Sequence, residues 1–503
     1  MTVNSKFLIG WSSTDITPEE PIVLRGQFHA RVSEGVNDPV TATVLALESQ
    51  DTDSANATIL VSCDLVGIPD CLRDSVREQV GKQLPELDVS RIILSATHTH
   101  TGPELSATND TIRPGRPSTI SDLYGVELPV MEPQEYTDRI VQRITRAVVS
   151  AWNARRPGKV GFGLAHAVVG HNRRVTYSDG KSRMYGNIND PEFRHVEGYE
   201  DHSVNLLGTW NTDGKLTGLV VNVACPSQVS ENEYQISADY WHETREELRS
   251  RLGDDVHVLA QCSAAGDQSP HLVGNQERNA DNVAGEENAE VRMWRLAEHT
   301  QREEIAQRIA DATEGGLPLM EKERESDPVF EHVVENVQLT RSQITPADVE
   351  EARRGAEEWK EKLGKLKNEL KENPGERNEP RWYVPITRAY RKVKWFEGVE
   401  KRYNIKEKEP KIPVEAHVVR IGDMVFSTNP FEYYLDFGLR MQARSRATQT
   451  FTVQLAGSGT YVPTEKAAAS GSYGAVPAST TVGPQGGREL VEWSVETINS
   501  MWK

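Results

Sequence analysis

The chain has 503 residues, 37% of them hydrophobic and 26% charged, with a formal net charge of −18 at pH 7. This composition is typical of a globular protein long enough to bury a large core in two or three structural units. The negative charge argues against nucleic acid and anionic membrane surfaces as partners.

No apolar run of 18 residues occurs, so no membrane span is predicted. The N-terminus also lacks an apolar stretch long enough for a signal peptide. The sequence as it stands predicts a cytoplasmic protein, and a secreted one if an export signal has been trimmed. Four cysteines without CxxC spacing are expected to be reduced and buried: Cys63, Cys71, Cys225 and Cys262.

Hydrophobic periodicity predicts strands that alternate with amphipathic helices, which indicates an α/β fold with a mixed, multi-stranded sheet and flanking helices. A segment rich in Pro, Ser, Thr and Gly at 104–133 is too long for a simple connection and is expected to form a loop over the site. Asn211-Thr-Asp-Gly214 predicts a hairpin turn between two strands. The strands are expected at 41–48, 57–62, 92–94, 159–169, 204–210, 216–224, 256–260, 414–420 and 424–427, and the helices at 69–83, 134–152, 239–252, 345–370 and 488–502.

From about 275 to 412 the charge becomes dense and hydrophobic residues thin out. Thr345-Pro-Ala-Asp348 is a helix-capping arrangement, and Asn373-Pro-Gly375 ends the helix that it starts. We therefore expect residues 1–275 and 413–503 to form one catalytic α/β domain around a long charged helical insertion at 276–412. An interaction arm is the alternative for that segment.

Polar clusters follow the predicted strands at 98–100, 171–174, 225–239, 266–271, 429–432 and 459–474. If the strands share a sheet, these ends converge and supply His, Arg, Asp, Ser, Glu and Tyr. This inventory suits a metal-assisted hydrolase, in which imidazole, carboxylate and phenolate ligands hold a divalent ion and leave a position for water. Bound zinc lowers the pKa of water to about 7.

Five short motifs lie in order along the chain: His98-Thr-His100-Thr-Gly-Pro, Asn172-Arg173, Gly266-Asp-Gln-Ser269-Pro, Pro430-Phe-Glu432, and Tyr461 with Tyr473. Together they resemble the N-terminal catalytic domain of neutral (non-lysosomal) ceramidases, which are zinc amidases that cleave an N-acyl bond. The first motif is similar to the family's His-Thr-His-Ser-Gly-Pro, and the second to its Asn-Arg-Ser. Gly266-Asp-Gln-Ser269-Pro is similar to Gly-Asp-Val-Ser-Pro, and Pro430-Phe-Glu432 to Pro-Gly-Glu. Tyr461 and Tyr473 resemble the paired tyrosines near the end of that domain.

The resemblance implies a role for each of these residues. His98, Glu432 and Tyr461 would be metal ligands, with zinc the expected ion. Ser269 would act either as nucleophile or as a positioning group, and we favour metal-bound water as the attacking group. Together with Ser269, the residues around the scissile carbonyl would be His100, Arg173 and Tyr473.

The chain also departs from the family. Where the family has a second histidine ligand, this chain has Ala224-Cys225-Pro226-Ser227. Either fewer protein ligands hold the ion, or Cys225, Asp239 or His242 substitutes, or the metal is lost; we include His242 among the candidate ligands. Replacement of the imidazole by a carboxylate or by water would favour a harder ion than zinc. The family's C-terminal immunoglobulin-like domain has no counterpart here, so we do not expect ceramide itself to be the substrate.

Three hypotheses follow. The first is a metal-dependent hydrolase that attacks an amide or related acyl bond of a polar small molecule. The second is a glycan-processing hydrolase on the same scaffold, with Trp241, Trp382 and Tyr383 as candidate sugar-stacking residues. The third is a metal-free binding or scaffold protein. The sequence leaves a homo-oligomer open.

Overall fold

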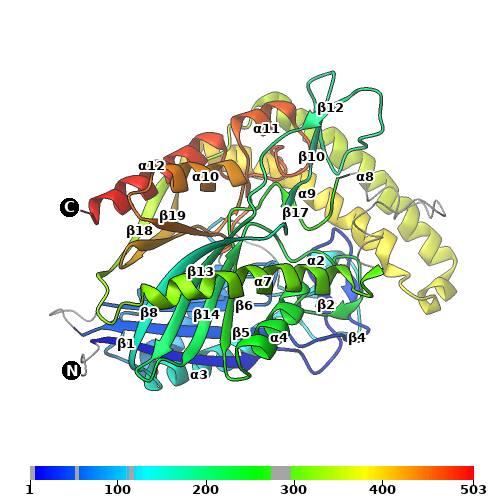
Figure 1. Ribbon diagram of the computed structural model, residues 1–503. Helices are drawn as coiled ribbons and strands as arrows, with labels where there is room; N and C mark the ends of the chain where they lie inside the picture. The colour runs from blue at the N-terminus through cyan, green and yellow to red at the C-terminus, as the bar shows by residue number, and fades with distance from the viewer. Residues whose placement is uncertain (1–5, 51–55, 109, 113–117, 274–295, 503) are drawn as a thin grey trace.

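The computed structural model describes residues 6–50, 56–108, 110–112, 118–273 and 296–502 (Figure 1). Parts of the 104–133 loop and of the 276–412 segment therefore lie outside the described residues. The main strands form an eight-stranded and a four-stranded sheet, both with parallel and antiparallel pairs. This confirms the predicted α/β class with a mixed sheet and flanking helices.

The eight-stranded sheet consists of two halves. They join where β1 pairs with β8 through only Leu8–Pro157 and Ile9–Arg156. One half contains β1, β5, β6 and β7, and the other β8, β13, β14 and β16. The strands are β1 (Phe7–Asp15), β5 (Thr41–Ser49), β6 (Asn56–Cys63), β7 (Ile92–Ala96), β8 (Arg156–His166), β13 (Ser203–Asn211), β14 (Leu216–Val223) and β16 (His257–Cys262).

The four-stranded sheet contains β18 (Phe330–Thr340), β19 (Lys411–Ile421), β20 (Met424–Thr428) and β22 (Gln449–Val453). The remaining strands form short pairs and one small three-stranded sheet. They are β2 (Val23–Leu24), β3 (Arg31–Val32), β4 (Gly35–Val36), β9 (His171–Asn172), β10 (Arg174–Tyr177), β11 (Ser182–Met184), β12 (Phe193–Val196), β15 (Gln235–Ile236), β17 (Gln268–Ser269), β21 (Glu432–Tyr433) and β23 (Tyr461–Val462).

The alternation of side chains along the strands creates an inner and an outer core. In β5, Val44 faces the outer helices, whereas its neighbour Leu45 points inward, as the period of two requires. The inner core joins the two halves of the eight-stranded sheet to the four-stranded sheet, with Leu45, Leu207 and Phe426 in a single cluster. A large buried core of this kind explains how polar loops at one end of the strands can be held rigidly.

Helices cover the outer faces of the sheets (Figure 1). Helix α3 packs on β1 and β5 beside α1, and α7 packs on β8 and β13 beside α4. Helices α10 and α12 lie over the four-stranded sheet. The bounds are α1 (Asp70–Gln83), η1 (Val89–Arg91), α2 (Ile120–Tyr124), α3 (Pro133–Asn153), α4 (Tyr240–Leu252), α7 (Gln301–Lys322), α8 (Pro346–Glu372), η2 (Pro374–Asn378), α9 (Tyr383–Lys408), α10 (Leu435–Arg444), α11 (Glu465–Ser470) and α12 (Pro484–Ser500).

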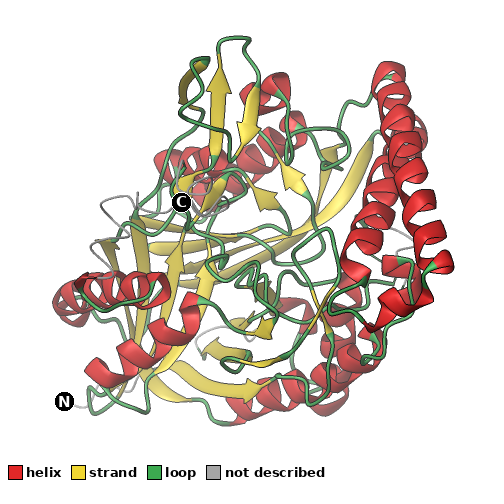
Figure 2. Cartoon of the chain, turned by 90° about the vertical axis from the view of Figure 1, so that its right-hand side faces the viewer, coloured by secondary structure: helices red, strands yellow, loops and turns green. Residues whose placement is uncertain are grey.

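Helices α8 and α9 form a long antiparallel hairpin at the edge of the molecule (Figure 2). The Thr345 side chain accepts from the backbone N–H of Asp348 in a capping box, as the sequence predicted. Within the 276–412 segment, α7 belongs to an outer helical layer and β18 to the four-stranded sheet. The domain boundaries at 276 and 412 stay predictions.

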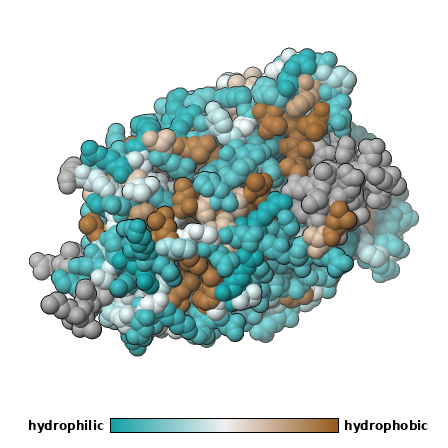
Figure 3. Space-filling view, in the orientation of Figure 1, coloured by the Kyte–Doolittle hydropathy of each residue, from teal (hydrophilic) through white to brown (hydrophobic). Residues whose placement is uncertain are grey.

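The surface in Figure 3 is mainly hydrophilic, with apolar patches separated by polar side chains. Over the described parts of the chain, no helix combines the length and apolar character that crossing a membrane requires.

Candidate functional site

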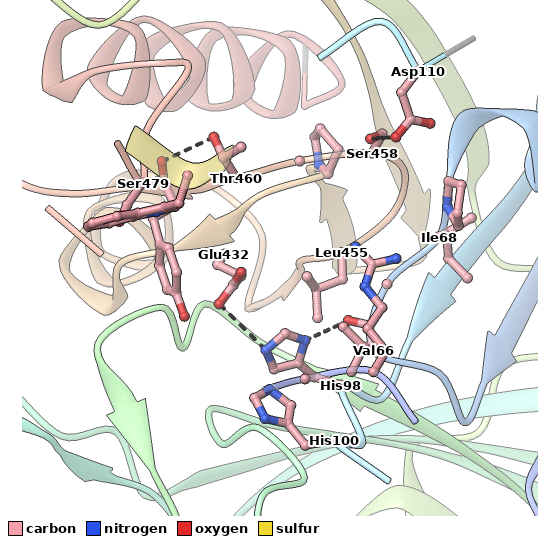
Figure 4. A pocket seen from close by; sticks show the side chains of 18 of the residues that line it. Val66, Ile68, His98, His100, Asp110, Glu432, Leu455, Ser458, Thr460 and Ser479 are labelled. Carbon is pink, nitrogen blue, oxygen red and sulfur yellow. Dashed lines mark hydrogen bonds and ion pairs between the residues drawn. The ribbon is translucent and has the colours of Figure 1, made fainter. Parts of the chain in front are cut away.

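A cavity of about 250 Å³ lies beyond the ends of β6, β7, β20 and β22 (Figure 4). The loops that follow these strands supply His98, Glu432 and Tyr461 to its lining. His98 is more than 300 residues away in sequence from Glu432 and Tyr461, so the fold brings these three predicted metal ligands together.

His98 is held in one orientation. Its Nδ1 lies 2.6 Å from the carbonyl oxygen of Val66, to which it donates, and its Nε2 lies 3.5 Å from Oε2 of Glu432 (Figure 4). The backbone of His98 has a φ of 68°, a conformation uncommon for a residue other than glycine. In an extended chain, residues two apart such as His98 and His100 would project to the same side, but His98 is not extended.

Glu432 and Tyr461 lie side by side because the short strands β21 and β23 pair in parallel with these two residues opposite each other. Burial alone would raise the pKa of Glu432, but hydrogen bonds from His98 and Tyr461 outweigh it and lower that pKa to about 2. The carboxylate is therefore ionised at neutral pH. Burial and the Glu432 charge hold the pKa of Tyr461 well above its usual value.

These donors fit a divalent cation. Because Nδ1 of His98 donates to Val66, Nε2 faces the Glu432 carboxylate with a proton when the ring is charged and with a lone pair when the ring is neutral. Two acceptors that face each other need a proton or a cation between them. In the described part of the chain, no group of three or more His, Cys, Asp or Glu side chains is arranged to hold a metal. An ion here would therefore need the Tyr461 phenol as a third ligand.

The residues proposed to replace the family's second histidine lie elsewhere. The Cys225 thiol is buried near the Val169 carbonyl oxygen, and burial raises its pKa well above the usual value. Asp239 accepts from the backbone N–H of Ser230 at 2.7 Å and so holds that loop. His242 lies on the first turn of α4 and does not line the cavity.

His100 faces different partners from His98. Nε2 of Gln228 lies 2.7 Å from Nε2 of His100, so the amide donates and the ring proton is on Nδ1, which lies 3.5 Å from Oε2 of Glu231. Burial lowers the pKa of His100 to about 4, although Glu231 opposes the shift. Gly26, with a φ of 122°, packs on the ring, and a Cβ there would lie 2.5 Å from Cγ of His100. His100 is thus a neutral imidazole whose Nε2 accepts from Gln228, while its buried Nδ1 makes no hydrogen bond with a described residue.

Arg173 connects the two histidine environments. Its Nη1 donates to Oε1 of Gln228 at 3.2 Å, and its Nη2 donates to the Gly266 carbonyl at 3.0 Å and lies 3.4 Å from the Tyr461 hydroxyl. The side chain is buried, and nearby tyrosines hold its pKa well above the usual value against the effect of burial. A fixed, buried cation of this kind can stabilise developing negative charge on an acyl oxygen.

Ser269 is fully buried and contacts Tyr185, whose hydroxyl also accepts a hydrogen bond from Arg173. Its Oγ accepts from the hydroxyl of Tyr185 and from the backbone N–H of His271, both at 3.1 Å. Within the described chain, no imidazole or carboxylate is hydrogen-bonded to this Oγ. The geometry favours a positioning serine, because a nucleophilic serine needs an adjacent base.

Tyr473 lies at the mouth of the cavity and is 37% exposed. Its ring packs edge-on against Tyr461 at 5.4 Å and Phe28 at 5.6 Å, and lies 6.1 Å from Trp395 of α9. The α8–α9 hairpin therefore contributes to the wall of the cavity.

Several residues of the site were missed by sequence reasoning. Gln228 and Glu231 lie inside the 225–239 cluster that the sequence singled out, but nothing in their spacing distinguished them from loop residues. Tyr185 and Trp395 carried no signal. The proposed sugar-stacking residues do not line the cavity: Trp241 is a buried core residue of α4, and Trp382 and Tyr383 pack with α2.

No family model and no curated protein matches the chain. Solved structures do match. The neutral ceramidase from Pseudomonas aeruginosa superimposes with a TM-score of 0.65 at 16% identity, over 99% of this chain and 75% of that chain. A ceramidase complexed with C2 gives a TM-score of 0.65 at 15% identity over the same shares. The chain therefore has the neutral-ceramidase fold.

Proposed function

We propose that the protein is a metal-dependent hydrolase that cleaves an amide or related acyl bond of a polar small molecule. The supporting observation is the pair of facing acceptors, Nε2 of His98 and the Glu432 carboxylate, with the Tyr461 phenol beside them. A divalent ion such as zinc, when bound, supplies a Lewis acid and a water of lowered pKa. Its ligands would be His98, Glu432 and Tyr461.

The other side chains would act on the substrate. Arg173 is placed to stabilise charge that develops on the acyl oxygen, and His100 to hydrogen-bond the reacting group after displacing Gln228. Ser269 and Tyr473 would orient the acyl group. The cavity lining includes Arg25, Asp110, Ser458 and Ser479, which supports a polar substrate over a lipid with two long chains.

Elemental analysis by ICP-MS tests this proposal. We expect about one equivalent of a divalent ion in the wild-type protein and its loss in Glu432→Gln, which keeps the size of the side chain. Glu231→Gln is the matched control, because Glu231 also faces a histidine at 3.5 Å but is not a proposed ligand. A wild-type protein that takes up no zinc or manganese would refute the metal-dependent reading.

A panel of amides, esters and glycosides, tested with the metal-loaded protein, identifies the bond. Hydrolysis of amides or esters that disappears in Glu432→Gln supports the proposal. Cleavage of glycosides alone would instead support a glycan-processing enzyme.

A further inference from the structure

One face of helix α9 carries three cations, Arg388, Arg391 and Lys392, which we call the basic face of α9. Their spacing of three and four residues places them on the same side of the helix. None of them makes an ion pair with a described residue, although Lys394 on the same helix pairs with Glu397 at 3.0 Å. Like charges so close destabilise a helix unless a counter-charge is bound.

Two of these cations lie over aromatic rings, and the third, Arg388, has its Nη2 3.3 Å from Nδ1 of His29. The Lys392 ammonium lies 3.7 Å from the ring centroid of Phe28 and 4.6 Å from that of Trp395. The Arg391 guanidinium lies 4.9 Å from the ring centroid of Tyr124. Cation–π contacts fix the position of a cation without neutralising it, so the charge remains to attract an anion.

The basic face borders the same cavity as the proposed metal ligands. Of the three cations of the basic face, Arg391 lines the cavity; Trp395 of the same helix, Arg25 and Arg402 line it as well. Positive potential extends to the loop beside this face, where burial together with Arg388 and Arg31 lowers the pKa of His29 to about 4.

The cavity lining also carries carboxylates, and one of its cations is already paired, because Arg25 lies 3.6 Å from Glu104. Asp110 accepts from the Ser458 hydroxyl at 2.7 Å and from the backbone N–H of Asp70 at 3.0 Å. Glu432 faces His98. In a chain with a net charge of −18, Arg391 on the cavity wall, with Arg388 and Lys392 beside it on α9, is a local concentration of positive charge that favours anionic ligands.

We propose that the substrate carries an anionic group, a carboxylate or a similar oxyanion, that binds to the basic face of α9. The acyl bond of the same molecule would lie at His98 and Glu432, and its apolar part would contact Phe28, Trp395 and Tyr473. N-acyl amino acids are the simplest class with this arrangement. The inference rests on the proposed function, because it names the substrate class of that site.

Isothermal titration with matched ligands tests the inference separately from catalysis. N-hexanoylglycine carries an amide and a carboxylate, and N-hexanoylglycinamide is its neutral counterpart. We expect the wild-type protein to bind the acid at least about tenfold more tightly than the amide. The double variant Arg391→Gln/Lys392→Gln should bind both equally, whereas Lys394→Gln should keep the preference. Equal thermal unfolding of the variants would show that the loss is not a folding defect.

Each outcome decides the matter. Equal or undetectable binding of acid and amide by the wild-type protein would overturn the inference, as would a preference retained in the double variant. If N-hexanoyltaurine also binds, the site accepts oxyanions in general; if it does not, the site selects carboxylates. Selective binding of the acid without any hydrolysis would support the anion site and contradict the proposed hydrolase function. Hydrolysis without a preference for the acid would support the hydrolase function and contradict the anion site.

Discussion

Replacement of Ser269 by alanine separates the two roles that a serine can have in this site. The change keeps Cβ and removes only the hydroxyl that accepts from Tyr185 and from the backbone N–H of His271. Each lost hydrogen bond has a net value of about 1 kcal/mol. If Ser269 positions the acyl group, kcat/KM should therefore fall by about 10- to 100-fold. Loss of a nucleophile would cost about 10⁶-fold.

The assay measures kcat/KM and the pre-steady-state time course with the best substrate from the acyl panel. Tyr185→Phe is the control, since it removes one of the two donors and leaves Ser269 in place; its effect should be no larger than that of Ser269→Ala. A fall of about 10⁴-fold or more in Ser269→Ala, combined with a burst of product in the wild-type enzyme, would refute the positioning role.

Two further variants test the structure around the site. Although burial opposes it, hydrogen bonds from a neighbouring histidine and Arg77 hold the pKa of Glu415 well below its usual value. A carboxylate with a lowered pKa stabilises the fold above about pH 5, and this contribution is lost as the pH falls. Glu415→Gln should therefore lower the free energy of unfolding by about 1–3 kcal/mol at pH 7 and flatten the pH dependence of Tm below pH 5. A variant whose Tm–pH curve runs parallel to that of the wild-type protein would contradict this. In Gly459→Ala the new Cβ would clash with the Pro430 carbonyl oxygen and displace the segment that carries Glu432. The affinity for zinc should therefore fall by about tenfold or more. Unchanged affinity in a zinc titration would show that the segment can adjust.

Local sequence patterns predicted the main elements well. The buried apolar run of β6 and the capping box at Thr345 each depend on a few neighbouring residues. The strand ends could be placed for the same reason, and with them the motif around His98.

The cavity wall could not be predicted, because it depends on contacts between distant segments. Trp395 reaches Phe28 only after the α8–α9 hairpin has packed against the loop that follows β2. Gln228 gains its place through hydrogen bonds to His100 and Arg173, which no spacing rule encodes. His242 has helical spacing that suits a site residue, yet α4 begins at a point that leaves it outside the cavity.

The α8–α9 hairpin forms a part of the cavity wall that is separate from the segments carrying the proposed metal ligands. Its own packing, through Val349 and Val399 at one end and Tyr383 and Ile386 at the other, holds it in place. It supplies the outer wall of the cavity and none of the proposed metal ligands. Exchange of this hairpin between homologous scaffolds would thus be a modular step, altering which molecules enter while preserving the chemistry that acts on them.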